Sequence, residues 1–251
     1  MTDQPVVLGT WSFAGDRIWG ASERAVCEKV VRRAVERGVD LFDTAPNYGD
    51  GRSEEVLGAA LGTNPELRVA TKIKIHDLSE QQIRTAVDGS RRRLGRDRID
   101  LLQIHWPAEQ VDATRRALET FVTLQSEGII AALGVCNFGH FDIDDFREYP
   151  IVSNQIPYSL LWRVVEGAAG IAARSQEAGW KTLAYTVVQQ GLLSGRYASV
   201  EEFPVSRHRT RQFQPEYRDR LNATLTRLLA ISDTTGRSLL ELSIATAARQ
   251  P

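Results

Sequence analysis

Cysteine is scarce in this sequence, with only Cys27 and Cys136 among 251 residues. So few cysteines argue against a disulfide framework or a zinc cluster, and no metal site is expected. Long apolar runs are missing as well: no segment is long enough to span a bilayer, and the N-terminus lacks a secretory pattern. We therefore expect a soluble, cytoplasmic protein without a membrane partner.

The sequence also has no excess of either charge. It contains 31 lysines and arginines and 32 acidic residues, which gives a formal net charge of −1. This balance gives no electrostatic reason to expect a nucleic acid or an anionic membrane as a partner. Lysine itself is rare: the chain has only Lys29, Lys72, Lys74 and Lys181. A lysine directly after a buried strand is therefore a signal, since lysine shifts its pKa on burial far more readily than arginine.

What the chain does contain is a regular alternation of short apolar runs and longer amphipathic segments. The spacing predicts strands over 6–10, 40–44, 69–73, 100–105, 131–137, 152–156 and 182–188. It predicts helices over 22–37, 52–61, 79–94, 112–127, 141–147 and 164–178. Such strand–helix repeats are typical of a parallel sheet with helical crossovers.

The number of repeats decides between two α/β architectures. Seven βα units without the glycine fingerprint of a doubly wound nucleotide-binding sheet favour a TIM-type (β/α)8 barrel, as one domain over residues 1–251. The glycine-, proline- and arginine-containing stretch 189–218 is expected to be a long loop. Helices are expected again at about 219–233 and from Ser238, where Ser238–Glu241 has the form of a capping box.

Four ionisable residues lie at or just after the ends of expected strands. Asp43 belongs to the second strand, Lys72 to the third and His105 to the fourth, while Tyr48 lies in the loop after the second. Active sites of such barrels form at the C-terminal ends of the strands. A nearby ammonium lowers the pKa of a phenol, a carboxylate holds the ammonium, and a histidine can orient a carbonyl. Each residue alone also fits a structural role; together they predict proton donation to a carbonyl that receives a hydride.

Several motifs carry a family resemblance over residues 8–251. They are Leu8-Gly-Thr-Trp11, Phe42-Asp-Thr-Ala-Pro-Asn-Tyr-Gly49, Arg52-Ser-Glu-Glu-Val-Leu-Gly58, Ala70-Thr-Lys72, Asp100-Leu-Leu-Gln-Ile-His-Trp-Pro107, Gly134-Val-Cys-Asn-Phe138, Ser153-Asn-Gln155 and Gly191-Leu-Leu-Ser-Gly195. In these motifs the chain resembles the aldo-keto reductases, NAD(P)H-dependent oxidoreductases. The resemblance implies that an aldehyde or ketone is reduced to an alcohol, with Tyr48 as the general acid, Lys72 and Asp43 tuning it, and His105 positioning the carbonyl.

The same resemblance implies NADPH as the cofactor, with NADH as the other candidate. Asn137 and Gln155 match amides that bind the nicotinamide carboxamide; without the resemblance they would be interpreted as buried structural amides. Tyr185 matches the aromatic residue that stacks on the nicotinamide ring, and the 191–195 loop would approach the pyrophosphate through backbone N–H groups. The complete set of expected cofactor contacts is Gly9, Thr10, Trp11, Asp43, Asn137, Gln155, Tyr185, Gly191, Leu192, Ser194 and Gly195.

A small carbonyl compound is the expected substrate, and the sequence indicates no particular oligomeric state. Trp11, Tyr48, His105 and Trp106 are expected to line the substrate pocket. The other aromatic candidates fit core packing equally well, and they are Phe13, Trp19, Phe138 and Trp162.

The chain also departs from the family pattern. Cys136 stands where serine is usual, and Tyr185 leads into Thr186-Val-Val188 instead of Ser-Pro-Leu. Seven of eight βα units are evident, and the chain stops before the expected eighth strand and the segment that grips the adenosine phosphate. The chain is then a truncated form of a longer parent, a barrel that closes by oligomerisation, or a protein with weak cofactor binding. Of these we expect truncation. A non-redox lyase or epimerase, or a catalytically weak binding protein, on the same barrel is the alternative function.

Overall fold

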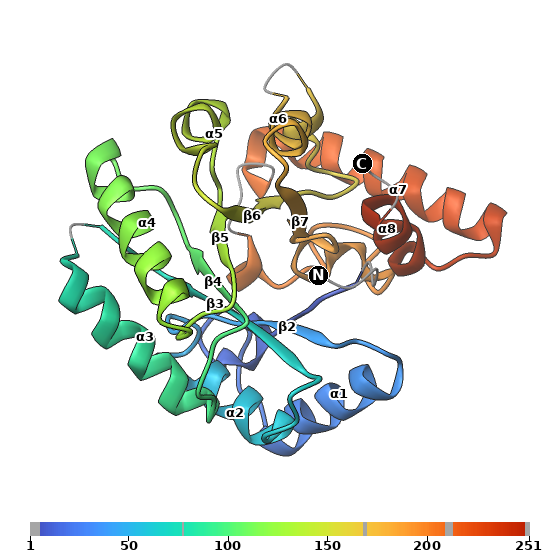
Figure 1. Cartoon of the computed structure of the whole chain (residues 1–251). Helices are drawn as coiled ribbons and strands as arrows, with labels where there is room; N and C mark the ends of the chain where they lie inside the picture. The colour runs from blue at the N-terminus through green and yellow to red at the C-terminus, as the bar shows by residue number, and fades with distance from the viewer. Residues whose placement is uncertain (1–5, 77, 168–169, 209–212, 249–251) are drawn as a thin grey trace. The chain divides into compact units, whose positions relative to one another are not determined.

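The computed structural model describes residues 6–76, 78–167, 170–208 and 213–248 (Figure 1). The chain divides into two compact units. The first unit comprises residues 1–156 and 169–183, and the second comprises 157–168 and 184–251. The single domain expected over 1–251 stays a prediction.

Seven strands form one sheet in the order in which they occur along the chain, from β1 to β7. The neighbouring strand pairs from β1–β2 to β5–β6 are all parallel. Parallel neighbours in chain order, separated by helices, are the arrangement that the sequence predicts for a (β/α)8 barrel. The strands are β1 (Leu8–Gly9), β2 (Leu41–Asp43), β3 (Arg68–Ile73), β4 (Leu101–Ile104), β5 (Leu133–Cys136), β6 (Ile151–Pro157) and β7 (Lys181–Tyr185).

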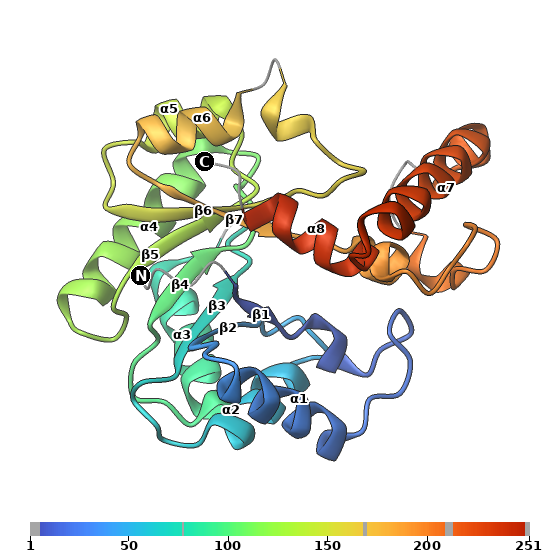
Figure 2. The same cartoon turned by 90° about the vertical axis from the view of Figure 1, so that its right-hand side faces the viewer.

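Helices alternate with these strands, and α1 to α4 lie on the outside of the sheet (Figure 1). Further along the chain, α5 and α6 lie side by side (Figure 2). A capping box at Ser79 begins the third helix: Ser79 Oγ accepts from the Gln82 backbone N–H, and the Gln82 side chain accepts from the Ser79 backbone N–H. The helices of the first unit are α1 (Arg24–Glu36), α2 (Arg52–Leu61), α3 (Glu80–Leu94), α4 (Val111–Ser126), α5 (His140–Phe146) and α6 (Ile171–Glu177).

The two faces of the sheet bury different kinds of side chain, because successive strand residues point to opposite faces. Phe42 and Leu102 are fully buried in the main apolar core, which is shared with residues of α2, α3 and α4. On the other face, Leu41, Ala70 and Leu101 form a small separate apolar cluster. Two residues further along each of these strands the same face carries a polar or charged side chain, and this change locates the candidate site.

Close packing of α2 on α3 depends on Gly58. A Cβ atom at this position would lie 2.6 Å from the Leu94 carbonyl oxygen, closer than real Cβ atoms approach. We expect Gly58→Ala to lower the free energy of unfolding by about 1–3 kcal/mol, because backbone atoms must move. Gly139→Ala is the control, since its Cβ would meet Asp142 Oδ2 at an ordinary 3.6 Å. Urea unfolding of both variants tests this, and an unchanged midpoint for Gly58→Ala would contradict it.

The helix predicted over 164–178 is wrong. The structure has a short 3-10 helix, η2 (Val164–Glu166), and separately α6. Gly170 precedes α6 with φ of +55°, a left-handed conformation that cannot belong to a continuous right-handed helix. Residues 168 and 169 lie outside the described residues.

The second unit contains more regular structure than the loop expected over 189–218. Short 3-10 helices interrupt that stretch, and residues 209–212 lie outside the described residues. The elements of this unit include η3 (Gln189–Ser194), η4 (Val205–Arg207), η6 (Pro215–Tyr217), α7 (Arg218–Thr235) and α8 (Leu239–Ala248).

A small core of its own holds the second unit together, and it includes Leu192, Phe203 and Leu225. The expected capping box at Ser238 is present, because Glu241 accepts from the Ser238 backbone and Ser238 Oγ accepts from the Glu241 N–H. In the part of the chain that the structure describes, no helix combines the length and apolarity needed to cross a membrane.

Candidate active site

Strand register brings the predicted site residues of β2, β3 and β4 to one face of the sheet. Asp43 pairs with Ala70 in β3, and Lys72 two residues further pairs with Gln103 in β4. His105 follows β4, again two residues beyond Gln103. Since side chains alternate along strands, Asp43, Lys72, Gln103 and His105 all point to the same side. The structure therefore places Asp43 and Lys72 on neighbouring strands and His105 directly after the next strand.

Lys72 is the centre of this group. Its side chain is only 1% exposed, and its Nζ lies 2.5 Å from Asp43 Oδ2, 2.9 Å from the Thr44 carbonyl oxygen and 3.3 Å from the Tyr48 hydroxyl. The ammonium also lies 5.0 Å from the centre of the Tyr48 ring. Lys74, by contrast, is exposed. Of the two lysines, Lys72 is thus the one whose ammonium is buried against Asp43 and Tyr48.

Burial and charge act against each other on the two proton-bearing groups. Burial lowers the pKa of Lys72, but the Asp43 carboxylate and Tyr48 raise it by more, so the net pKa lies above the ordinary value. For Tyr48, burial is the largest effect and raises the pKa, while Lys72 lowers it; the net pKa is above the ordinary 10.0. The lowering by Lys72 that the sequence predicts is present but outweighed. The phenol therefore keeps its proton at neutral pH.

Asp43 receives donors from three other strands. Besides Lys72 at Oδ2, its Oδ1 accepts from Gln103 Nε2 at 3.1 Å and from Gln155 Nε2 at 2.9 Å. Gln103 is completely buried and is not among the residues that the sequence argument identified. The sequence does contain a signal that Gln103 belongs to the site. It lies two residues before His105, and in a strand this spacing turns both side chains to the same face. The carboxylate is consequently held at both oxygens.

His105 lies beside the phenol. The two rings are 6.1 Å apart in an edge-to-face arrangement. Burial, and next the charge of Lys72, lower the pKa of His105 to about 3, so the imidazole is neutral at physiological pH. Its Nδ1 is enclosed and has no hydrogen-bond partner among the described residues. A neutral imidazole can donate a hydrogen bond to a carbonyl oxygen without competing with Tyr48 as the acid.

Aromatic side chains cover the phenol. Trp11 stacks on Tyr48 at 6.0 Å, and Trp19 meets Trp11 edge-on at 5.3 Å. Asp16 Oδ1 accepts from the backbone N–H groups of Ile18 and Trp19 and so shapes the loop that carries Trp19. These contacts place an apolar wall beside the Tyr48 hydroxyl.

The other aromatic residues considered for the substrate pocket differ in how deeply they are buried. Trp106, next to His105, is 53% exposed, whereas Phe13 and Phe138 belong to the main core. Trp162 lies in the second unit. Core packing therefore explains Phe13 and Phe138, while Trp106 is free to contact a ligand.

The first predicted cofactor contacts lie at the end of β1. Thr10 is fully buried, and its Oγ1 donates to the Asp43 carbonyl oxygen at 3.0 Å and lies 2.8 Å from Ser53 Oγ. Ser53 Oγ in turn donates to the Thr10 carbonyl oxygen at 2.8 Å. The Thr10 side chain thus ties the start of α2 to β1 and β2. At Gly9 a Cβ atom would meet no described residue within 4 Å, so no contact among those residues requires glycine there.

Two amides at the ends of β5 and β6 could hold a nicotinamide carboxamide. Asn137 adopts φ of +63° and donates from Nδ2 to the His105 carbonyl oxygen at 3.0 Å. Gln155 uses Nε2 for Asp43, and its carboxamide oxygen accepts no hydrogen bond from any described residue. An amide with a fixed N–H side and an unused acceptor, placed next to the Asp43 carboxylate that pairs with Lys72, fits the carboxamide of a nicotinamide cofactor.

The other predicted cofactor contacts belong to the second unit, and they are Tyr185, Gly191, Leu192, Ser194 and Gly195. Leu192 is fully buried in the core of that unit. The backbone N–H groups of Gly191 and Leu193 both donate to the Val188 carbonyl oxygen, which uses two of the donors expected for a pyrophosphate. Contact between this loop and a cofactor stays a prediction.

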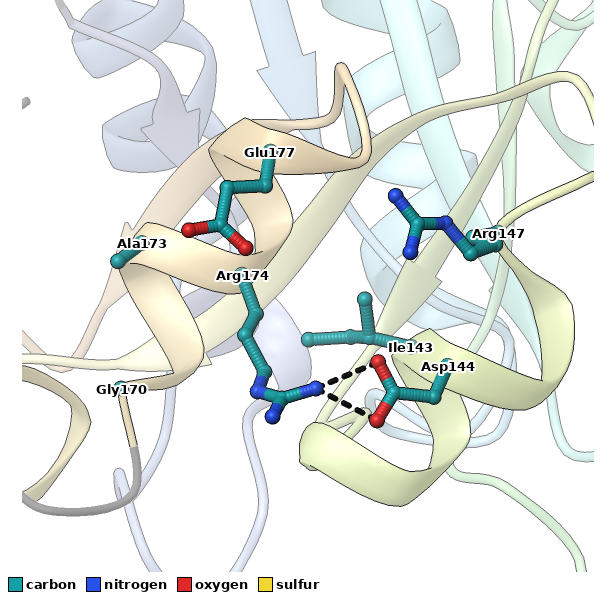
Figure 3. A pocket seen from close by; sticks show the side chains of 7 residues that line it. All are labelled: Ile143, Asp144, Arg147, Gly170, Ala173, Arg174 and Glu177. Carbon is teal, nitrogen blue, oxygen red and sulfur yellow. Dashed lines mark hydrogen bonds and ion pairs between the residues drawn. The ribbon is translucent and has the colours of Figure 1, made fainter.

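A separate surface hollow lies between α5 and α6 (Figure 3). Arg174 Nη1 pairs with Asp144 at 2.5 Å across it. None of the predicted site residues lines this hollow. It is therefore a feature of the outer helices and not part of the candidate active site.

Comparisons with known proteins show which family this chain resembles. A family model described as "Aldo/keto reductase family" matches residues 5–251. The chain is 32% identical to the aldo-keto reductase YhdN of Bacillus subtilis, over 97% of this chain and 77% of that protein. It is also 32% identical to the NADH-specific methylglyoxal reductase of Escherichia coli, over 75% of this chain and 64% of that protein.

Among solved structures, the glycerol dehydrogenase AKR11B4 of Gluconobacter oxydans superposes with a TM-score of 0.82. The match has 30% sequence identity and covers 98% of this chain and 80% of that one. The predicted TIM-type fold class is thereby confirmed.

Proposed function

The chain belongs to the aldo/keto reductase family of NAD(P)H-dependent oxidoreductases, and on that premise we propose that it reduces an aldehyde or ketone to an alcohol, with the proton coming from Tyr48. The observation that supports this most is the position of the Lys72 ammonium, 2.5 Å from Asp43 Oδ2 and 3.3 Å from the Tyr48 hydroxyl. A buried phenol beside a buried ammonium is suited to give up a proton and to be stabilised afterwards as a phenolate.

The bound cofactor supplies the hydride that reduces the carbonyl carbon, and NADPH or NADH can fill this role. Around the substrate, neutral His105 donates a hydrogen bond that orients the carbonyl oxygen next to Tyr48. As negative charge develops on that oxygen, the Tyr48 hydroxyl transfers its proton to it. Lys72 then stabilises the phenolate, and Asp43 keeps the ammonium charged and in position. On the cofactor side, Asn137 and Gln155 hold the carboxamide.

A small carbonyl compound is the substrate class that we propose. Relatives of this chain are named for methylglyoxal and for glycerol, whose aldehyde counterpart is glyceraldehyde. Trp11 beside the phenol and exposed Trp106 beside His105 supply apolar faces on which a short carbon chain can pack. Methylglyoxal and glyceraldehyde are therefore the first substrates to test.

The direct experiment measures loss of NADPH or NADH absorbance by the purified chain with each aldehyde. Consumption of the nucleotide together with formation of the alcohol supports the proposal. No nucleotide binding, measured by quenching of the fluorescence of the five tryptophans, would overturn it. Turnover that persists after all nucleotide has been removed would favour the non-redox alternative.

The pH dependence of reduction follows from the two pKa shifts. The acid must carry its proton, and because the pKa of Tyr48 is raised, that proton is lost only as the pH rises above 10. His105 is already neutral above about 3, so it adds no acidic limb near its ordinary value of 6.5. We expect kcat/KM for the aldehyde to be flat from roughly pH 6 to 9 and to fall above 10. An inflection between pH 6 and 7 that disappears in His105→Gln would contradict this assignment.

A further inference from the structure

We propose that Gln103 is a positioning residue that fixes the Asp43 carboxylate and the Gln155 carboxamide relative to each other. It would thereby connect the proton-donating group of Lys72 and Tyr48 to the amide that faces the nicotinamide. This inference rests on the proposed function and assigns a role to a residue outside the expected site.

The hydrogen bonds of Gln103 form a closed triangle. Its Nε2 donates to Asp43 Oδ1 at 3.1 Å, and its Oε1 accepts from Gln155 Nε2 at 3.5 Å. Gln155 closes the triangle by donating to the same Asp43 oxygen at 2.9 Å. Because Gln103 supplies both a donor and an acceptor, it determines which way the Gln155 amide points. With its N–H side held on Asp43 and Gln103, the Gln155 oxygen is left facing away from them.

The surroundings of Gln103 leave its side chain little freedom. It is completely buried, and its Oε1 also lies 3.7 Å from the Cys136 thiol, which donates to it. Its register partner on β5 is Gly134, where a Cβ atom would lie only 3.0 Å from Gln103 Cγ. Glycine at this position thus leaves room for the glutamine. A side chain that is enclosed on all sides and satisfied at both ends suits a positioning role better than a packing role.

The charged and titratable groups around this amide come from β2 to β5. Asp43 and Cys136 contact Gln103 directly, Lys72 is its register partner on β3, and Tyr48 is reached through Lys72. His105 lies two residues beyond Gln103 along the chain. Burial keeps the thiol of Cys136 protonated by raising its pKa. Asp43 is therefore the anion that the Gln103 N–H group contacts directly. Loss of the Gln103 N–H donor would leave Lys72 and Gln155 as the only side-chain partners of the Asp43 carboxylate among the described residues.

Gln103→Glu gives the sharpest test, because the side chain keeps its size while its donor becomes titratable. A protonated carboxyl group can still donate to Asp43 Oδ1, whereas an ionised one places a second negative charge beside it. We expect kcat to fall at least about tenfold at high pH, with recovery as the pH is lowered. The nucleotide dissociation constant, measured by tryptophan fluorescence, should follow the same pH dependence, while the wild type shows neither change between about pH 6 and 9.

Gln103→Met removes both hydrogen-bonding ends without adding charge. We expect a lower kcat and a weaker nucleotide affinity, each by about tenfold and without the recovery at low pH. Thr71→Val is the matched control on the opposite face of the same sheet. It removes the buried hydrogen bond from Thr71 Oγ1 to Glu54 Oε1, at 2.7 Å. It should reduce stability but leave the pH profile and the nucleotide affinity unchanged.

The outcomes separate this inference from the proposed function. If the wild-type chain shows no nucleotide-dependent reduction, the proposed function fails and the inference fails with it. If the wild type is active and Gln103→Glu keeps its kcat, affinity and pH profile, only the role of Gln103 is overturned. If Gln103→Met does not fold, the recovery of Gln103→Glu at low pH decides the question within one folded variant.

Discussion

Replacement of Tyr48 by phenylalanine is expected to reduce kcat for carbonyl reduction by roughly 10²–10⁴-fold, the range that a positioned general acid contributes. The substitution removes one oxygen atom and keeps the ring that stacks on Trp11 at 6.0 Å. Because the amides of Asn137 and Gln155 do not contact the hydroxyl, nucleotide affinity should be nearly unchanged. Steady-state kinetics and fluorescence titration with NADPH measure the two effects separately.

Tyr149→Phe is the matched control for this change. Tyr149 packs against Phe146 in the outer layer, away from Lys72, so loss of its hydroxyl should leave kcat unaffected. Normal reduction by Tyr48→Phe would remove the proposed acid. A loss of both activity and nucleotide binding would instead indicate that the phenol has a structural part in the cofactor site.

Replacement of Lys72 by methionine is expected to have the second large effect, on both stability and turnover. The change leaves the largely buried Asp43 carboxylate without its cation, and removal of one member of a buried pair typically costs 3–5 kcal/mol. The Gln103 and Gln155 donors remain, so we expect about 3 kcal/mol, the lower end of that range. Turnover should fall as well, because no ammonium would stabilise the phenolate. Denaturant unfolding and steady-state kinetics measure these effects.

Lys74→Met tests whether the losses of stability and turnover expected for Lys72→Met come from the buried position of that lysine or from the loss of a positive charge alone. Lys74 is exposed and lies only two residues beyond Lys72, so its replacement should change neither stability nor kcat appreciably. In the double variant Lys72→Met, Asp43→Asn the unpaired charge is absent, and its stability loss should be smaller than the sum of the single losses. Equal effects of Lys72→Met and Lys74→Met would show that the buried ion pair has no special importance.

Much of the fold could be predicted because the strands and helices follow hydrophobic periodicity closely. The helix predicted over 52–61 is α2 (Arg52–Leu61), and the strand predicted over 69–73 is one residue shorter than β3. The error over 164–178 has a local cause: the apolar spacing continues across Gly170, and nothing in that spacing shows that this glycine adopts φ of +55°. Such a backbone conformation depends on the surrounding structure.

The ionisable residues of the candidate site could be predicted from the sequence. Asp43, Lys72 and His105 end successive strands, and parallel topology alone brings such residues together. Gln103 could not be found in this way, because its significance lies in partners 60 and 52 residues away. The net pKa of Tyr48 was equally inaccessible, since it depends on how far burial exceeds the effect of Lys72. Neither the contacts of Gln103 nor the balance of effects on the pKa of Tyr48 can be obtained from the sequence, because both depend on the folded structure.

The carboxylate of Asp43 also has a consequence for how the protein folds. Its partners Lys72, Gln103 and Gln155 are separated from it by 29, 60 and 112 residues along the chain. Contacts of such long sequence separation form only after large loops have closed, which slows folding and delays their appearance. The carboxylate therefore acquires its full set of donors only when β2, β3, β4 and β6 are all in register, which ties catalytic competence to a late step of sheet assembly.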